Sequence, residues 1–242
     1  MKNLSAYLNV RAYLTLIPIV LFVLSGCASY GNSIVELISK SIKPEPGGNS
    51  ALLSPAYRYL RVSIKGRSIF VTLGDQDDHP DGPIEVYYST GREVIRLQNG
   101  RIVGTVGLLS EWRNVSVRDM PGWRTAVSAS SPIAGERIRD VMPGYRFGVR
   151  DKLILSKIPS PGKTQLVDIH ADSLTWFEER FENAVAKSYA RLFTQSDTTI
   201  EYLPPARYAV AFAGDRETVV YGEQCLAPDL CFTWQRWSPK KP

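Results

Sequence analysis

From Tyr57 onward the chain contains short stretches in which apolar and polar residues alternate. In the first of these, Leu60, Val62 and Ile64 occupy every second position. Successive side chains of a β-strand point to opposite faces of a sheet, so the alternation predicts strands with one buried face. Turn residues separate the stretches, and Asn99-Gly100 is typical of a two-residue type I′ hairpin. Strands are predicted at residues 60–64, 69–73, 84–89, 92–98, 101–108, 114–118, 124–128, 151–158, 207–213, 218–224 and 231–237.

Two segments depart from this period of two. Apolar residues over 34–42 follow mixed helical spacing and stop at the Pro- and Gly-rich run 43–50, which predicts a short helix that either packs on the domain or contacts a membrane or a partner. Apolar residues also recur at helical spacing over 173–193, behind the candidate caps Asp172 and Ser173. We therefore expect a mainly β fold, an antiparallel sheet curled into an open barrel or a sandwich, with a short N-terminal helix and one helix near 173–193.

The N-terminus has the pattern of an export signal. A basic start precedes the apolar run 12–24, which is too short to span a bilayer. The run ends in Leu24-Ser25-Gly26-Cys27, which resembles the lipobox where bacterial lipoproteins are cleaved and lipidated on the cysteine. The alternative is a plain secretion signal with an incidental cysteine. We predict a lipoprotein signal peptide at 1–26, a lipidated tether with a short helix at 27–56 and a single β-rich periplasmic domain at 57–242.

Composition agrees with a folded domain that does not bind nucleic acid. The chain is 44% hydrophobic, and all five tryptophans follow residue 26, so a sizeable core can form. Formal net charge is +5, and loss of Lys2 and Arg11 with the signal peptide leaves +3. This positive charge is too small and too scattered for a nucleic-acid surface. No second apolar segment is long enough to cross a membrane.

The two remaining cysteines are expected to form a disulfide. Cys225 and Cys231 are close in sequence, and thiols pair in an oxidising periplasm. The alternative is a metal or redox pair, but redox pairs usually have the spacing C-x-x-C, and a zinc site needs further ligands. The chain has only His79 and His170 to offer, far apart in sequence, so no metal site and no cofactor are predicted.

Catalytic motifs are missing from the sequence. The acidic run Asp75–Gly82 suggests calcium, but an EF-hand needs a glutamate at its twelfth position, where Val86 stands, so a hairpin loop is the preferred interpretation. No Gly-x-Ser-x-Gly elbow is present. Glu178 and Glu179 are adjacent and would diverge on a helix, which makes them a poor pair for glycoside hydrolysis.

Three pairs of tryptophan and arginine are candidate contact residues for a glycan or a protein partner. They are Trp112-Arg113, Trp123-Arg124 and Arg236-Trp237. A flat ring beside a guanidinium can stack a sugar and hold its acidic group. The alternative is a core tryptophan next to a solvated arginine.

Several stretches together resemble the YjbF/GfcB lipoproteins of exopolysaccharide and group-four capsule systems. They are Tyr59-Leu60-Arg61-Val62, the run 93–107 (EVIRLQNGRIVGTVG), Met142-Pro143-Gly144-Tyr145-Arg146 and the run 221–237 (YGEQCLAPDLCFTWQRW). The resemblance implies a mostly β lipoprotein of the outer membrane that faces the periplasm and works beside a β-barrel outer-membrane partner. Ala28 after the lipobox also fits outer-membrane sorting, by resemblance. No catalytic motif comes with the family.

These features favour a non-enzymatic accessory lipoprotein for exopolysaccharide or capsule export or assembly. Its lipid would hold it to the membrane through Cys27, and polysaccharide is a further candidate partner. Two alternatives have distinct marks. An enzyme that modifies the polysaccharide would hold two carboxylates, or a serine near a histidine, in a cleft. A carrier of a lipid-linked intermediate would contain a deep, dry, apolar cavity, and a filled interior would count against it.

Overall fold

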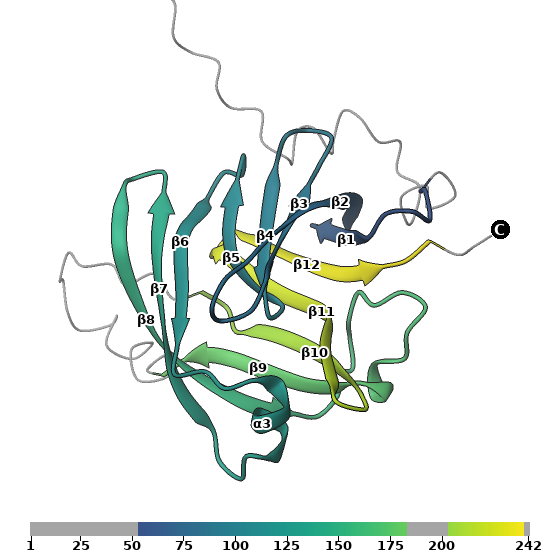
Figure 1. Cartoon of the computed structure of the whole chain (residues 1–242). Helices are drawn as coiled ribbons and strands as arrows, with labels where there is room; N and C mark the ends of the chain where they lie inside the picture. Colours follow the sequence, from purple (N-terminus) through teal and green to yellow (C-terminus); the bar gives the residue numbers. More distant parts are fainter. Residues whose placement is uncertain (1–52, 183–202, 240–242) are drawn as a thin grey trace, which may run out of the picture. The chain divides into compact units, whose positions relative to one another are not determined.

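The computed structural model describes residues 53–182 and 203–239, which all belong to one compact unit of the chain. These residues form a single 12-stranded antiparallel sheet (Figure 1). The predicted signal peptide, Cys27, the helix at 34–42 and part of the helix at 173–193 lie outside the described residues. The strands are β1 (Tyr59–Ile64), β2 (Arg67–Asp77), β3 (Ile84–Tyr88), β4 (Val94–Gln98), β5 (Arg101–Val106), β6 (Glu111–Arg118), β7 (Ile133–Met142), β8 (Arg146–Ile158), β9 (Thr175–Phe181), β10 (Ala206–Ala213), β11 (Arg216–Ala227) and β12 (Leu230–Trp237).

The order of strands makes the sheet two meanders joined in the middle. Strands β5 to β1 follow one another, β1 pairs with β12, and β12 to β6 follow in turn. The two ends of the sheet are therefore β5 and β6, which are neighbours in the chain. The sheet curls so that these ends lie side by side (Figure 1), where the Trp112 amide donates to Thr105 Oγ1 at 3.0 Å. This nearly closed barrel confirms the predicted open barrel, and we call the meeting of β5 and β6 the seam.

The hairpin predicted at Asn99-Gly100 is confirmed. Both residues have positive φ, 49° and 78°, as a type I′ turn requires. A Cβ at Gly100 would come within 2.4 Å of Val219, so glycine is needed here for space as well as for conformation.

The helix predicted over 173–193 is wrong where the structure describes it. A 3₁₀ turn, η2 (Ala171–Ser173), leads into strand β9, which pairs with β8 and with β10. Phe177 and Phe181 are four residues apart, a spacing that puts two side chains on one face of a strand as well as of a helix. Trp176 on the other face is also buried, so β9 lacks the alternation typical of a half-buried strand.

Three further expectations need correction. Residues 124–128, predicted as a strand, lie in the helix α3 (Trp123–Ser128), which buries Trp123 and Ala126 at helical spacing. The polar loop predicted from Asp75 begins later, because β2 continues to Asp77 opposite Ile84. Strand β7 was not predicted at all, because its inward side chains include Arg137 and Arg139 rather than apolar residues.

Side chains fill the interior of the sheet. The largest fully buried ones include Trp112, Trp234, Tyr208 and Phe177. Helix α3 packs against β8, and its Trp123 ring lies 5.2 Å from the rings of both Phe177 and Tyr208. The interior is therefore a packed core with one polar cluster, described below.

Candidate functional site

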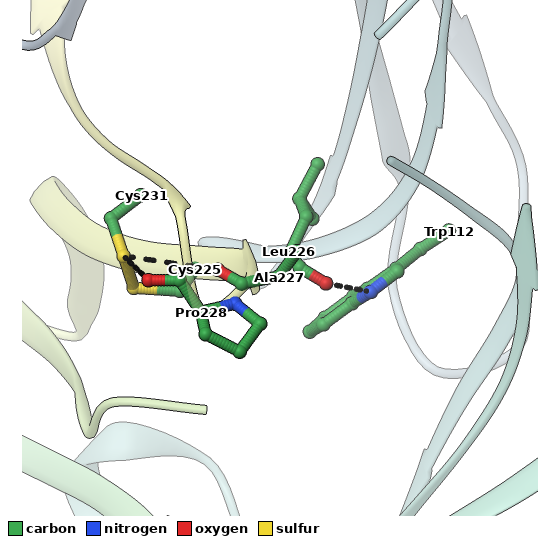
Figure 2. The surroundings of a disulfide bond; sticks show 6 residues. All are labelled: Trp112, Cys225, Leu226, Ala227, Pro228 and Cys231. Atoms are coloured by element: carbon green, nitrogen blue, oxygen red, sulfur yellow. Dashed lines mark hydrogen bonds between the residues drawn. A yellow bond between two sulfur atoms is a disulfide. The ribbon is translucent and has the colours of Figure 1, made fainter. Parts of the chain in front are cut away.

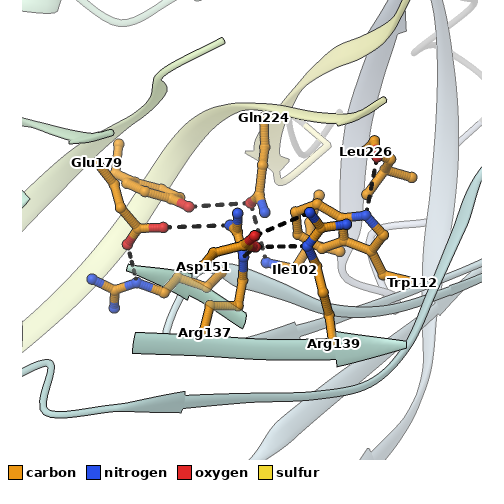
Figure 3. Close-up of polar contacts among 10 residues, drawn as sticks. Ile102, Trp112, Arg137, Arg139, Asp151, Glu179, Gln224 and Leu226 are labelled. Atoms are coloured by element: carbon orange, nitrogen blue, oxygen red, sulfur yellow. Dashed lines mark hydrogen bonds and ion pairs between the residues drawn. The ribbon is translucent and has the colours of Figure 1, made fainter. Parts of the chain in front are cut away.

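Five ionisable side chains form a buried cluster inside the sheet (Figure 3). Asp151 accepts from Arg137 Nε at 2.8 Å and from Arg139 Nε at 2.6 Å. Glu179 accepts from Arg101 Nε at 2.8 Å and lies 3.7 Å from Arg137 Nη1. Three arginines and two carboxylates give the cluster a formal charge of +1. Buried charges need partners of this kind, because an unpaired ion in a core is costly.

Trp112 lies between this cluster and the disulfide hairpin. Its ring is fully buried, with the guanidinium carbons of Arg137 and Arg139 at 4.4 and 4.7 Å from the ring centre. Its indole N–H donates to the Leu226 carbonyl at 3.0 Å (Figures 2 and 3). The ring therefore has a structural role, and a sugar cannot stack on it while the sheet is closed.

The predicted disulfide is present. Cys225 and Cys231 are bonded across the β11–β12 hairpin, where they face each other in the strand register (Figure 2). The hairpin carries Leu226 between them, so the disulfide supports the carbonyl that holds Trp112.

The second tryptophan pair is also structural. Trp123 is 2% exposed, donates to the Asn99 carbonyl at 3.0 Å and carries the Arg101 guanidinium over its ring at 4.2 Å. Arg124 donates to the Gly214 carbonyl, and its backbone N–H donates to Glu217. The Trp123 ring, predicted as a contact surface, is therefore buried in the core, where helix α3 packs against the sheet.

The remaining predicted pair holds β12 to β3. Arg236 donates to both carboxylate oxygens of Glu85, at 2.8 and 2.5 Å, and to the Tyr87 hydroxyl at 3.1 Å. Burial, the largest single effect, lowers the pKa of Arg236, but the hydrogen bonds to Glu85 and Tyr87 and the charge interactions with both together outweigh it and raise that pKa. Trp237 packs beside Phe70, with ring centres 5.4 Å apart.

The side chain of Arg113 is about half exposed. It pairs with Glu111 at 2.8 Å, two residues away on β6. The three pairs thus do not converge on one surface. Each pair was predicted because its members are neighbours in sequence, whereas the contacts of Trp112, Trp123 and Arg236 come from other strands.

A groove of about 650 Å³ lies in the seam, a feature that sequence reasoning missed. It is lined on one side by Arg101 and Val103 of β5 and on the other by Val117 and Arg118 of β6. The loops 80–81 and 119–123 extend the lining with Asp81, Asp119, Met120 and Pro121. The residues of the groove come from separate segments that share no sequence motif. The polar, exposed residues at the end of β6 were the only signal in the sequence that could have indicated it.

A second surface lies at the other end of the seam, which we call the apolar rim. It consists of Val106 and Leu109 at the β5–β6 turn and Tyr145 and Phe147 at the β7–β8 turn. These side chains are 42%, 56%, 75% and 66% exposed. The two turns are adjacent because Glu111 pairs with Met142. Exposed aromatic side chains of this kind are typical of contact surfaces.

In the ranges 53–182 and 203–239, no group of three His, Cys, Asp or Glu residues could hold a metal ion. Over the same part of the chain, no helix is long and apolar enough to cross a membrane.

Comparison with known proteins gives a likeness to a solved structure. No protein family matches the chain, and no curated protein matches it. The solved structure of the hypothetical lipoprotein YmcC from Escherichia coli K12 has a TM-score of 0.50 and 17% sequence identity. The likeness covers 88% of this chain and 100% of that protein. At this identity it shows the fold, which extends over the whole of the solved protein.

Proposed function

We propose that this protein is an outer-membrane lipoprotein that serves as a non-enzymatic accessory factor in export or assembly of an exopolysaccharide or capsule. The lipobox at Cys27, the resemblance to the YjbF/GfcB lipoproteins and the fold shared with a hypothetical lipoprotein support this proposal. The observation that carries it is the apolar rim, a set of exposed aromatic and aliphatic side chains on an otherwise well-packed barrel.

The filled interior favours a contact role over a carrier role. Tyr208, Trp234 and Phe177 occupy the space that a lipid chain would need, and the ion cluster makes the rest polar. A lipid-binding barrel would instead enclose a large apolar cavity. We therefore do not favour transport of a lipid-linked intermediate.

The partner that we propose is a β-barrel protein of the outer membrane. Lipid on Cys27 would confine the domain to a thin layer at the membrane, which raises its effective concentration near such a partner. The rim residues Tyr145 and Phe147 would supply the buried aromatic contacts that dominate protein interfaces.

Two variants test this proposal. Replacing Cys27 with serine should leave the protein unlipidated and away from the outer membrane, and it should reduce secreted polysaccharide. The rim variant Tyr145→Ser with Phe147→Ser should keep the protein folded and in place but lose a co-purifying β-barrel protein and reduce secretion. Tyr57→Ser is the matched control, since Tyr57 is 57% exposed just before β1. Normal outer-membrane fractionation of Cys27→Ser, or normal secretion without the gene, would refute the proposal.

A polysaccharide-modifying enzyme is the second candidate. Two carboxylates, Asp81 and Asp119, line the groove, and a hydrolase acting on glycans uses a pair of carboxylates. An enzyme should release shorter chains from purified polysaccharide, and Asp119→Asn should abolish that release. Unchanged chain length with the wild-type protein would remove this candidate.

A further inference from the structure

We propose that the groove in the seam binds an uncharged segment of a glycan chain through hydrogen bonds to sugar hydroxyls. The inference rests on the proposed function, since it assumes that polysaccharide passes near the domain. It names the chemistry of the ligand, which the proposed function leaves open.

The size and construction of the groove suit a short stretch of sugar units. Its volume of about 650 Å³ lies within the range of ligand sites in proteins, roughly 300–1,000 Å³. Its floor is rigid, because Arg101 is fixed by Glu179 at 2.8 Å and stacks on Trp123 at 4.2 Å. Asp81, Arg118 and Asp119 in its lining are exposed, so the groove opens to solvent and can accept part of a longer chain.

The lining combines the groups that a sugar requires. Arg118 and Asp119 are exposed, and within 53–182 and 203–239 their side chains form no hydrogen bond or ion pair. A hydroxyl both donates and accepts, so a carboxylate and a guanidinium together can bind it. Met120, Pro121 and Val117 give apolar surface against which the C–H face of a sugar ring can pack.

The charges of the groove favour a neutral ligand. Its exposed ionisable side chains are Asp81, Asp119 and Arg118, which sum to a formal charge of −1. Arg101 is already paired with Glu179. The exposed lining side chains thus carry no net positive charge that would attract an acidic glycan, whereas hydroxyls meet both acceptors and a donor.

A peptide strand is less suited to the seam than a glycan. Strand addition uses free N–H and C=O groups along a sheet edge. Here the Ile102 N–H donates to Gln224 Oε1 at 3.3 Å, and the Trp112 N–H donates to Thr105 Oγ1 at 3.0 Å. Side chains from within the domain thus already bind donors of both edge strands.

The test is direct binding by the full-length lipidated protein, purified in a detergent without a sugar headgroup. The probes are neutral glucan and mannan oligosaccharides, oligogalacturonate as the acidic probe, and fragments of the polysaccharide that the producing cells secrete. Arg118→Gln and Asp119→Asn remove one charge each; asparagine keeps the shape of aspartate, and glutamine keeps a polar amide on a shorter side chain. Asp229→Asn is the matched control, since Asp229 is exposed on the distant β11–β12 turn.

We expect a neutral probe to bind, and each groove variant to weaken its binding by about tenfold or more, as loss of a hydrogen bond to a charged group does. The control should stay within about twofold of the wild type. Binding of no glycan, stronger binding of the acidic probe, unchanged binding by both groove variants, or binding of extended peptides in place of glycans would each overturn the inference. Secretion by cells lacking the gene tests the proposed function separately. A secretion defect without glycan binding refutes the groove site alone, and normal secretion refutes the proposed function whatever the groove binds.

Discussion

Replacement of Asp151 by asparagine should strongly destabilise the domain. The carboxylate is the shared acceptor for Arg137 and Arg139, at 2.8 and 2.6 Å, and all three side chains are 5% exposed. Asparagine keeps the size of the side chain but removes its charge. The formal charge of the buried cluster then rises from +1 to +2, and Arg139 loses its only ion pair within the described residues.

The expected loss follows from the burial of these groups. Removing one partner of a buried ion pair typically costs about 3–5 kcal/mol, because the other charge is left without compensation in a medium of low polarity. An exposed pair contributes about 0–1 kcal/mol. Arg150 and Glu136 form such a pair at 3.0 Å on the same two strands, with the arginine side chain 62% exposed. Glu136→Gln is therefore a control with the same chemistry at the surface.

Urea unfolding followed by tryptophan fluorescence measures the difference. With a slope of about 2–3 kcal/mol per molar urea, Asp151→Asn should lower the midpoint by about 1–2 M without changing the slope. The Glu136→Gln midpoint should fall by less than about 0.5 M. Equal shifts for the two variants would refute the argument, because the buried cluster would then contribute no more than a surface pair.

A double variant separates the loss of a pair from the creation of an unpaired charge. Asp151→Leu with Arg139→Met removes both ions, while Arg137 keeps Glu179 at 3.7 Å. The double variant should be more stable than Asp151→Asn alone, since apolar pairs of similar volume often replace buried ions without loss. A double variant less stable than the single one would show that packing, and not the unpaired charge, dominates.

Two other properties can be checked by spectroscopy and thermal unfolding. Replacing Cys225 and Cys231 with serine should reduce the free energy of unfolding by only about 2 kcal/mol, because the disulfide closes a short loop. The melting temperature of this variant should be lower than that of the wild type and should not change when reductant is added. Burial raises the pKa of Tyr87 to about 12 and raises those of Tyr208 and Tyr221 as well, so the neutral phenols stabilise the fold fully below pH 10 and this contribution is lost as pH rises above it. Tyrosinate absorbance should therefore show three tyrosines that ionise only in step with alkaline unfolding, and ordinary titration of every tyrosine near pH 10 would contradict the burial.

Local pattern was sufficient for the strands that have an apolar inner face. Leu60, Val62 and Ile64 alternate in the sequence and are all buried in β1, so the inward face could be read directly. The Asn99-Gly100 turn likewise depends only on the conformations that its two residues accept.

The same reasoning failed where the inner face is charged. The inward positions of β7 include Arg137 and Arg139, so the alternation of polar and apolar residues assigns the buried face of this strand to the wrong side. The acceptor of both arginines, Asp151, lies on the next strand, β8. Tryptophan and arginine do stack in this protein, but Trp112 meets arginines of β7 and not its neighbour Arg113. Contacts between strands distant in sequence leave no trace in a local pattern.

The pairing of β1 with β12 has a consequence for the order in which the molecule can assemble. Every other strand pair joins neighbours in the chain, so each meander can form from local contacts as soon as its strands have been made. The β1 edge, in contrast, must wait for residues 230–237, which are made after all the other strands of the sheet. A chain that ends before β12 is left with two half-sheets, in which β1 and β11 each lack the neighbour that β12 would supply. The eight residues of β12 therefore join the two halves of the sheet.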